Sequence, residues 1–379
     1  RDSGAGGILN QCIHNGFGLH YFHEELTGPE FADRLLDRVD GRIELVRNAT
    51  ATVLENDADG LGVVVYSAES GITRYQCKSI VLAMGSRERN RGNIHIPGTR
   101  PSGIFTAGLA QRLVNIEGHI PGEDVVIVGS GDIGLIMARR MSWIGARVHG
   151  VVEIQPYPSG ITRNIVQCLN DFGIPLYLSH VITGIRGASR VESVEISPLE
   201  QGHPVAEKSF EVACDTILLS VGLIPENELS RTLGIEMNKE TGGPLVDADL
   251  MTSHDGVFAC GNVLHVHDLV DYACEEAERC ADGVHAYISG TQRDVGGPVA
   301  AGAQVRYVVP SSYDGRRENR FYLRPMVVAN GLKLLVRSGG AVVARKALPH
   351  VQPSEMVALT LRADALAALG GAAVEVSIE

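Results

Sequence analysis

A glycine-rich decapeptide, VVIVGSGDIG at Val125–Gly134, limits the possible folds of this chain more than any other segment. An apolar run at Asp124–Val128 precedes its glycines and predicts a buried strand. A helical pattern follows at Leu135–Ile144, and a second apolar run at Arg147–Val152 predicts another strand. A strand, a GxGxxG loop, a helix and a strand in this order indicate a βαβ unit that binds a dinucleotide.

Each glycine of this loop has a separate role in such a unit. Gly129 allows the strand to turn tightly, and Gly131 has no Cβ, so the backbone can approach a pyrophosphate. Gly134 allows the helix to pack against the strand, while the first N–H groups and the dipole of the helix face the phosphates. The predicted cofactor-binding loop therefore consists of Gly129, Ser130, Gly131, Asp132, Ile133 and Gly134.

An acidic residue, Glu153, follows the second predicted strand, 22 residues after Gly131. A carboxylate at this place accepts hydrogen bonds from a ribose 2′-hydroxyl and repels a 2′-phosphate. The sequence therefore favours NAD over NADP. The alternative is a glycine-rich turn in an α/β domain that binds no ligand.

Length, charge and cysteine content narrow the class of protein. The 379 residues correspond to two or three domains, since a domain commonly has about 150 residues. Acidic residues outnumber basic ones by 45 to 33, and the net charge of −12 argues against a nucleic-acid partner. No apolar stretch approaches the ~20 residues of a membrane span, and no signal peptide is visible. The seven cysteines form no CxxC pair, which is typical of a reduced, cytoplasmic chain.

Three other predicted strands end in glycine, as expected where a chain passes close to a cofactor. The first is VLAMG, which contains Ala83 and Gly85, and the second is ILLSVG, which ends at Gly222. The third is GVFACGN, where Gly261 and Asn262 follow the strand and a long predicted helix comes shortly after. These strands lie on both sides of the βαβ unit in the sequence and indicate a second nucleotide site.

With these motifs the chain resembles the pyridine nucleotide–disulfide oxidoreductase superfamily from residue 1 to about residue 290. The resemblance implies an α/β fold in which an NAD-binding Rossmann-like domain is inserted into an FAD-binding Rossmann-like domain. The insertion would be residues 119–245, and the divided FAD-binding domain would be residues 1–118 and 246–290. The remaining residues, 296–379, alternate short β-like runs with turns and predict a small β-rich C-terminal domain.

The resemblance also assigns flavin-binding residues. GVFACGN resembles the second FAD motif of the family, in which Gly261 would approach the pyrophosphate and the next side chain would bind the ribityl–phosphate region. The family usually has Asp at that position, where this chain has Asn262. The family's own FAD-binding GxGxxG is expected about 30 residues before Gly6 and Gly7, and it is absent from this chain, so we expect an N-terminally incomplete FAD-binding domain.

The segment after Gly6 and Gly7 reads GGILNQCIHNGFG and departs from the disulfide members of the family. Those members have a redox CxxxxC there, whereas this chain has Cys12 alone. The segment more closely resembles the α-type subunits of amino-acid and opine-type dehydrogenases, and small oxidoreductases found with glycerol-3-phosphate dehydrogenases. By this analogy Cys12 would be a thiolate near the flavin ring, or His14 a proton carrier for reduced flavin. The alternative is a packed thiol and a loop histidine bonded to the backbone.

The sequence therefore predicts an FAD-dependent NAD(P)H oxidoreductase that passes hydride between a nicotinamide nucleotide and flavin without a redox disulfide. The first alternative is the FAD-binding component of an oligomeric amine, amino-acid or glycerol-3-phosphate dehydrogenase with several different subunits. The second alternative is a non-catalytic scaffold subunit. For the chain as a whole, the expected partners are a small-molecule substrate or electron acceptor, and a partner subunit or a second copy of the chain. A second copy is expected because dimers are common in the family that the chain resembles.

Two close histidine pairs occur in the chain, His20 with His23 and His265 with His267. A metal site needs a third ligand in suitable geometry. Nothing in the sequence supplies that ligand, so we predict no metal site. The histidines are expected to be polar lining near the cofactor cleft.

Overall fold

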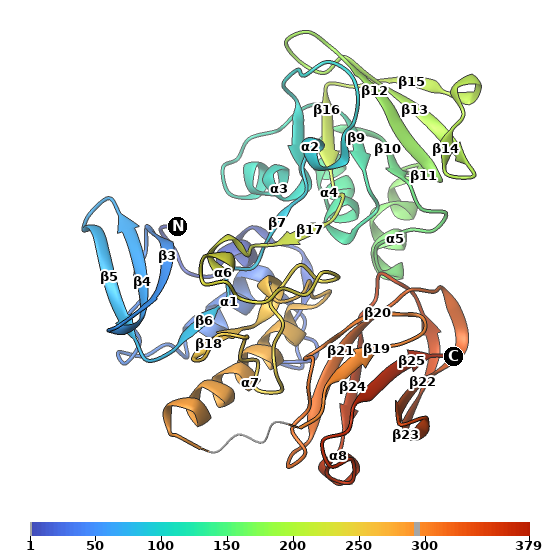
Figure 1. Ribbon diagram of the computed structural model, residues 1–379. Helices are drawn as coiled ribbons and strands as arrows, with labels where there is room; N and C mark the ends of the chain where they lie inside the picture. Colours follow the sequence, from blue (N-terminus) through green and yellow to red (C-terminus); the bar gives the residue numbers. More distant parts are fainter. Residues whose placement is uncertain (1, 292–295) are drawn as a thin grey trace.

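The computed structural model describes residues 2–291 and 296–379. Arg1 and part of the glycine-rich segment before the C-terminal domain lie outside the described residues. Figure 1 shows an α/β domain at the top, a central region around a long helix, and a β-rich C-terminal domain at the lower right. Among the described residues, no helix has both the length and the apolar character needed to cross a bilayer.

The α/β domain is built on a five-stranded parallel sheet with strand order β11-β10-β9-β16-β8. Alternate residues of its strands face opposite sides, and both sides are covered. Val125 and Ile127 pack on the helices of one face, while Val126 packs on an antiparallel sheet that covers the other face. The strands are β8 (Ile104–Thr106), β9 (Asp124–Val128), β10 (Arg147–Glu153), β11 (Leu176–Leu178) and β16 (Thr216–Leu219), with helices α3 (Ala107–Asn115), α4 (Asp132–Trp143) and α5 (Thr162–Cys168). The covering sheet consists of β12 (His180–Arg186), β13 (Ser193–Glu200), β14 (His203–Pro204) and β15 (Phe210–Ala213).

The edges of this domain differ from the predicted boundaries at 119 and 245. β8 and α3 precede residue 119, yet β8 pairs with β16 as the edge strand of the parallel sheet. At the other end, α6 (Glu228–Thr232) and the residues after it contribute Leu229 and Ile235 to the core of the central region. β8 is only three residues long, so its residues show too little periodicity to indicate a strand.

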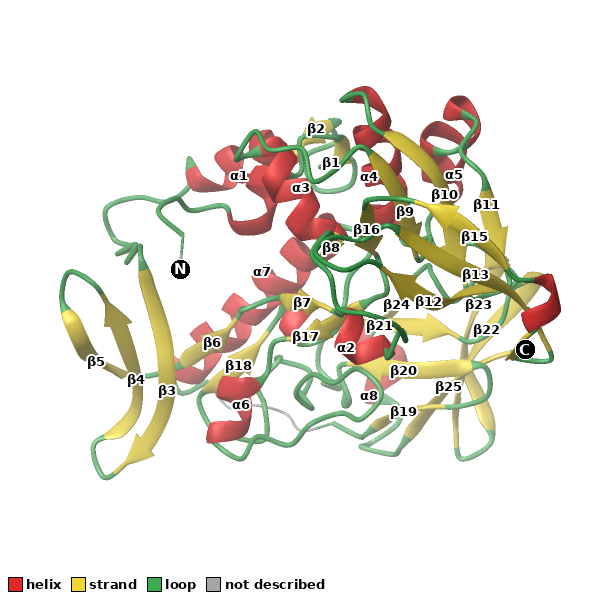
Figure 2. Ribbon diagram, turned by 90° about the horizontal axis from the view of Figure 1, so that it is seen from above, coloured by secondary structure: helices red, strands yellow, loops and turns green. Residues whose placement is uncertain are grey.

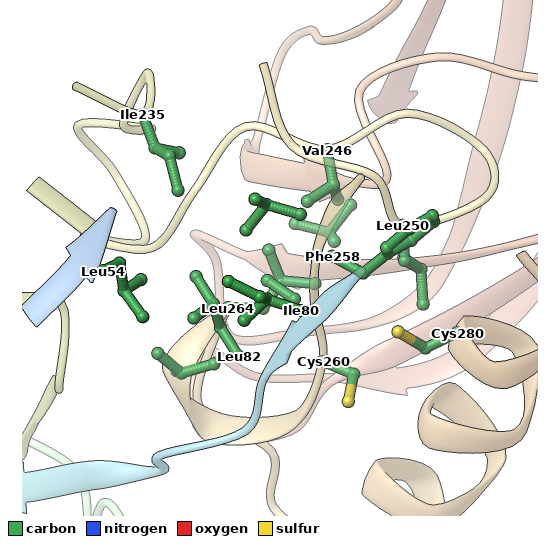
Figure 3. Close-up of a cluster of buried hydrophobic side chains, with 14 of the residues drawn as sticks. Leu54, Ile80, Leu82, Ile235, Val246, Leu250, Phe258, Cys260, Leu264 and Cys280 are labelled. Atoms are coloured by element: carbon green, nitrogen blue, oxygen red, sulfur yellow. The ribbon is translucent and has the colours of Figure 1, made fainter. Parts of the chain in front are cut away.

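The central region brings together segments that lie far apart in the sequence. β6 (Ile80–Leu82) pairs in parallel with β18 (Val257–Ala259), and helix α7 (Val270–Ile288) packs beside them. Figure 3 shows the apolar side chains of this core, with Cys260 and Cys280 among them. An antiparallel sheet stands apart at one side in both Figure 1 and Figure 2. Its strands are β3 (Ala49–Asp57), β4 (Gly60–Ser67) and β5 (Gly71–Cys77).

The N-terminal segment is mostly irregular, as its many turn residues indicate. It contains a short 3₁₀ helix, η1 (Gly7–Gln11), and leads to helix α1 (Gly28–Leu36). Thr27 caps α1 in a reciprocal capping box with Glu30, which explains why the helix begins there.

Two short antiparallel strands connect the α/β domain with the central region. They are β7 (Ser86–Glu88) and β17 (Leu223–Pro225). Each strand is preceded by a glycine with positive φ, Gly85 at +75° and Gly222 at +97°. The carbonyl of Gly85 accepts the N–H of Glu226, and the carbonyl of Gly222 accepts the N–H of Arg89. These two glycines therefore mark the points where the chain crosses between domains.

The C-terminal domain consists of two packed sheets, which confirms the prediction of a β-rich appendage. Their inner faces enclose a core that includes Phe321, Leu334 and Val376. One sheet contains β19 (Val299–Ala301), β25 (Val374–Ile378), β22 (Ala329–Ser338) and β23 (Ala341–Val351), and the other β20 (Val305–Val309), β21 (Asn319–Pro325) and β24 (Val357–Leu361). The short helix α8 (Ala363–Ala367) follows β24.

Candidate nucleotide and flavin site

The GSGDIG loop joins β9 to α4, as the sequence predicts. Gly129 has φ +88°, and a Cβ there would overlap the carbonyl oxygen of Ser220 at the end of β16. A Cβ on Gly134 would lie 2.7 Å from the Cβ of Ser220. Gly131 is the N-cap of α4, so the positive end of the helix dipole lies at this turn. The glycines thus bring the loop and the start of α4 close to the neighbouring strand, as a pyrophosphate-binding turn requires.

Asp132 lies between Gly131 and Gly134, in the first turn of α4, and ties this helix to α5. Its Oδ1 accepts the N–H of Ile161 at 3.0 Å and the side-chain amide of Asn164 at 2.6 Å. Burial raises the pKa of Asp132, and the negative charge of Asp268 adds to that rise. Asp268 lies six residues after Asn262, so a charge from the segment after the predicted flavin turn acts on the first turn of α4.

Glu153 lies at the end of β10, only 3% exposed, and its carboxylate organises the NAD loop. Oε2 accepts hydrogen bonds from the backbone N–H of Ser130 at 2.9 Å, from its hydroxyl at 2.6 Å and from the Ser159 hydroxyl at 3.0 Å. Oε1 accepts the N–H of Gln155 at 2.9 Å. The Ser130 hydroxyl in turn accepts the N–H of Ser159. Oε1, with one hydrogen bond within the described chain, is the oxygen that a ribose hydroxyl could use.

The N-terminal loop places Cys12 in a packed environment. Gly6 precedes η1 with φ +104°, and Gly7 begins η1 with φ +55°. The Cys12 thiol donates to the carbonyl of Ile8 at 3.3 Å, and the side-chain oxygen of Gln111 lies 3.6 Å from Sγ. Burial raises the pKa of Cys12 to about 11. These contacts favour the packed thiol over the reactive thiolate, because the thiolate is scarce at neutral pH.

His14 lies two residues further along this loop, between polar and aromatic neighbours. Its Nδ1 lies 3.2 Å from the carbonyl oxygen of Asn15, and its ring centroid lies 5.0 Å from that of Phe17. Nε2 is buried, and no hydrogen-bond partner for it occurs in the described part of the chain. Burial lowers the pKa of His14, and the charges of Arg139 and Arg163 lower it further. A neutral imidazole with one unused nitrogen can take up a proton at that nitrogen.

The GVFACGN motif forms a turn directly after β18. Gly261 has φ +73°, and no atom lies within 4 Å of the position of a Cβ there, so the turn borders open space. Oδ1 of Asn262 accepts the N–H of His267 at 3.0 Å. The amide nitrogen of Asn262 is a hydrogen-bond donor, which suits a phosphate.

Ala83 and Gly85 follow β6, beside this turn in the sheet, and Ala83 is exposed. The described structure therefore brings Ala83, Gly85, Gly261 and Asn262 to one edge of the β6–β18 pair, because parallel strands end at the same side. Gly222 lies at the domain crossing described above. Binding of the cofactor by these residues stays a prediction.

The structure supplies the third ligand-type residue that the sequence analysis did not find. Glu276 of α7 lies with His265 and His267, and one ligand atom from each residue falls within 4.8 Å of the others. His265 Nε2 is 2.9 Å from Glu276 Oε2, and His267 Nε2 is 3.1 Å from Glu276 Oε1. The expectation that no third ligand-type residue accompanies these histidines was therefore wrong. Glu276 lies on a helix after the histidines, and the fold of the loop between them decides whether the three meet.

Asp271 of α7 is a further residue that sequence reasoning missed. It is 1% exposed, and its carboxylate accepts the backbone N–H groups of Gly18, His20 and Tyr21 at 3.3, 3.0 and 2.8 Å. Helix α7 thus holds the N-terminal loop on one side and the Gly261 turn on the other. Only the tertiary fold reveals this pairing, because the contacts join residues about 250 positions apart.

Comparisons with known proteins agree with this arrangement. A family profile described as pyridine nucleotide-disulphide oxidoreductase matches residues 10–277. Dihydrolipoyl dehydrogenase of Pseudomonas aeruginosa is 30% identical over 285 residues, which cover 72% of this chain and 55% of that protein. An opine oxidase subunit of Agrobacterium tumefaciens is 26% identical over 202 residues, which cover 49% of this chain and 39% of that protein. The chain spans about half the length, or less, of these curated relatives.

A solved structure supports the fold. Thioredoxin reductase from T. acidophilum matches with a TM-score of 0.61 at 19% identity, over 76% of this chain and 88% of that chain. This likeness supports the predicted α/β fold with two Rossmann-like domains.

Proposed function

Because the chain belongs to the pyridine nucleotide-disulphide oxidoreductase family, we propose that it passes hydride between a nicotinamide nucleotide and FAD without a redox disulfide. The observation that carries this proposal is the GSGDIG turn between β9 and α4, to which the buried Glu153 carboxylate is hydrogen-bonded, together with the Gly261–Asn262 turn after β18. The negative charge of Asp268, in the segment after Asn262, also contributes to the raised pKa of Asp132 in the first turn of α4. The GSGDIG turn would hold the nicotinamide nucleotide, and the Gly261–Asn262 turn would hold the ribityl–phosphate part of FAD.

The residues present fit the pyrophosphate of a nicotinamide nucleotide and the ribityl–phosphate part of FAD. The N-terminus of α4 offers N–H donors and a positive dipole to a pyrophosphate, and the Asn262 amide offers a donor to the flavin phosphate region. When bound, FAD supplies hydride transfer at its flavin ring. The chain itself binds and orients the two nucleotides through these turns. His14, with its buried and unused Nε2, is the residue we propose to hold the proton that accompanies reduction.

Glu153 supports NAD over NADP as the nicotinamide nucleotide. Its carboxylate is held in one orientation by the Ser130 and Ser159 donors, with Oε1 left for a ribose hydroxyl. A 2′-phosphate at the same place would meet a fixed negative charge.

The absence of a local disulfide partner separates this proposal from thiol-based chemistry. Cys12 is the single cysteine of the N-terminal loop, and its thiol is buried with a raised pKa. A dithiol cycle in this loop would need a second cysteine and an accessible thiolate.

A second candidate is the FAD-binding component of a dehydrogenase with several different subunits. Its support is the similarity to the opine oxidase protein, which is named as one subunit of that oxidase. In that case electrons from an amine, amino acid or glycerol 3-phosphate would reach a partner subunit, and NAD would have no role. A scaffold subunit without catalysis is the third alternative.

One experiment distinguishes the three. The purified full-length protein is loaded with FAD, and its absorption near 450 nm, a property of oxidised flavin, is recorded. It is then titrated anaerobically with NADH, NADPH, an opine and glycerol 3-phosphate. Bleaching by NADH supports the proposal. Bleaching by an organic substrate but not by NADH supports the dehydrogenase component, and failure to hold flavin supports the scaffold.

A further inference from the structure

We infer that Glu276 is a positioning residue for the flavin: its carboxylate fixes the Gly261–Asn262 turn, and the two histidines that hold this carboxylate make the turn depend on the docked C-terminal domain. The inference rests on the proposed function for its flavin part. The anchoring of the turn can be tested without flavin.

The Glu276 carboxylate is fully buried and accepts three hydrogen bonds. The backbone N–H of Gly261 donates to Oε1 at 2.7 Å, and His267 and His265 contact Oε1 and Oε2 respectively. Burial alone would raise the pKa of Glu276, but the two histidines outweigh it and hold that pKa well below its usual value. An ionised carboxylate is a strong acceptor, so the Gly261 N–H is held by a charge-assisted bond.

The position of this N–H matters because Gly261 has φ +73°, a conformation that glycine adopts without preferring it. A flexible residue at the start of the turn needs an external contact to keep one conformation. The next residue is also held, since Asn262 accepts the His267 N–H at 3.0 Å. His267 therefore makes two of the contacts that hold the turn: its backbone N–H donates to Asn262, and its ring contacts Glu276.

The hydrogen-bond pattern favours a metal-free network. Both histidines direct Nε2 to the carboxylate, and both Nδ1 atoms are buried without a partner among the described residues. A metal-bound imidazole normally donates its other N–H to an acceptor, which these rings lack. The Arg279 guanidinium also lies 4.0 Å from Glu276 Oε2, where a divalent cation would meet a like charge.

The C-terminal domain closes over this network. The Tyr322 ring lies 5.8 Å from His265 and 5.5 Å from His267, and the Tyr307 ring lies 5.8 Å from His265. Arg324 of β21 pairs with Asp268 at 2.9 Å, one residue after His267. These contacts exclude water from the carboxylate, and exclusion of water strengthens each of its hydrogen bonds.

The test compares Glu276→Gln with Glu275→Gln. Glu275 is the neighbouring glutamate of α7, but it contacts Arg320 and the Tyr322 hydroxyl and not the turn. Amide hydrogen exchange of the peptide containing Gly261 is measured in the flavin-free full-length chain. We expect exchange at least about tenfold faster in Glu276→Gln, since a loss of 1.4 kcal/mol gives a factor of ten, and near the wild-type rate in Glu275→Gln.

The effect of Glu276 on the flavin is tested by measuring the dissociation of FAD and the midpoint potential of the bound flavin across pH. Glu276→Gln should release FAD at least about tenfold more readily and shift the potential, while Glu275→Gln should change neither. His267→Leu, which removes one contact and keeps the carboxylate, should shift the same quantities in the same direction and serves if Glu276→Gln does not fold.

Three results would overturn the inference. One is an unchanged exchange rate at Gly261 in both Glu276→Gln and His267→Leu. Another is an equal effect of Glu275→Gln, which would indicate loosening of the whole helix. The third is stoichiometric zinc in the wild-type chain that is lost in Glu276→Gln. If the turn loosens as expected but the wild-type chain neither binds FAD nor reacts with NADH, the proposed function is wrong. The role of Glu276 in holding the Gly261 turn is then still supported.

Discussion

Replacing Glu153 with Gln tests the nucleotide site most directly, because the side chain keeps its size and loses its charge. In the native chain Oε2 accepts three hydrogen bonds, and Oε1 accepts the Gln155 N–H. Glutamine has one acceptor oxygen. If that oxygen replaces Oε2, the amide NH₂ faces the Gln155 N–H, and the acceptor proposed for the ribose hydroxyl is lost.

The size of the effect follows from these bonds. A hydrogen bond to a charged group contributes about 1.5–3 kcal/mol, so NADH should bind about 10- to 150-fold more weakly. NADPH should lose less or gain affinity, because the charge that opposes its 2′-phosphate is removed. The preference for NADH over NADPH should therefore fall at least about tenfold. The unpaired Gln155 N–H should also lower the free energy of unfolding by about 1–3 kcal/mol.

The assay is equilibrium titration of the chain with each nucleotide, together with urea unfolding. Ser142→Ala is the control, since Ser142 lies on α4, the helix that follows the loop, and its hydroxyl bonds only the Ala138 carbonyl among the described contacts. The reasoning is refuted if folded Glu153→Gln binds NADH and NADPH as the wild type does. Glu153 would then serve only to tie the Gln155–Ser159 segment to the loop.

Three further outcomes are expected. Gly134→Ala should lower the free energy of unfolding by about 1–3 kcal/mol, because the new Cβ would lie 2.7 Å from Ser220 Cβ; a urea midpoint equal to the wild type would contradict this. Burial lowers the folded-state pKa of His265 below its usual 6.5, and the folded-state pKa of Glu276 is also lowered. The unfolded chain therefore binds more protons below pH 6.5, so stability should be complete above that pH and fall as pH decreases, as urea melts at pH 5 and 7.5 would show. Burial raises the pKa of Cys12 from 9.0 to about 11, so its alkylation by iodoacetamide at pH 8 should be about 100-fold slower in the folded chain than in urea; equal rates would show an accessible thiolate.

The NAD-binding unit could be predicted from sequence because its signals are local. The strand at Asp124–Val128 has the predicted bounds, since a continuous apolar run flanked by a charged residue and glycine has few other interpretations. The helix begins at Asp132 rather than at Leu135, because its N-cap is a glycine of the binding loop itself. The local sequence pattern therefore predicts the βαβ unit and the order of its elements. The glycine N-cap moves the start of the helix from Leu135 to Asp132.

Other features depend on contacts that no local pattern encodes. β8 joins the parallel sheet only because β16, more than 100 residues later, offers an edge. The hydrogen bond from the Ser159 hydroxyl to Glu153 requires the segment around Ser159 to fold back over the loop. A serine in an irregular segment does not indicate such a contact in the sequence. The same holds for Glu276, which follows His265 by 11 residues but meets it only because a short turn reverses the chain before α7.

The acidic residues just before and in the first half of α7 connect this helix to three different parts of the chain. Buried carboxylates are costly unless each is paired or hydrogen-bonded, and these are satisfied by different parts of the chain. Asp268, just before the helix, binds Arg324 of the C-terminal domain, Asp271 binds the N-terminal loop, and Glu276 binds the Gly261 turn. A helix that faced a single partner would not need its acids distributed in this way. The C-terminal domain therefore contributes to the cofactor region through α7, although none of its residues was predicted to bind a cofactor.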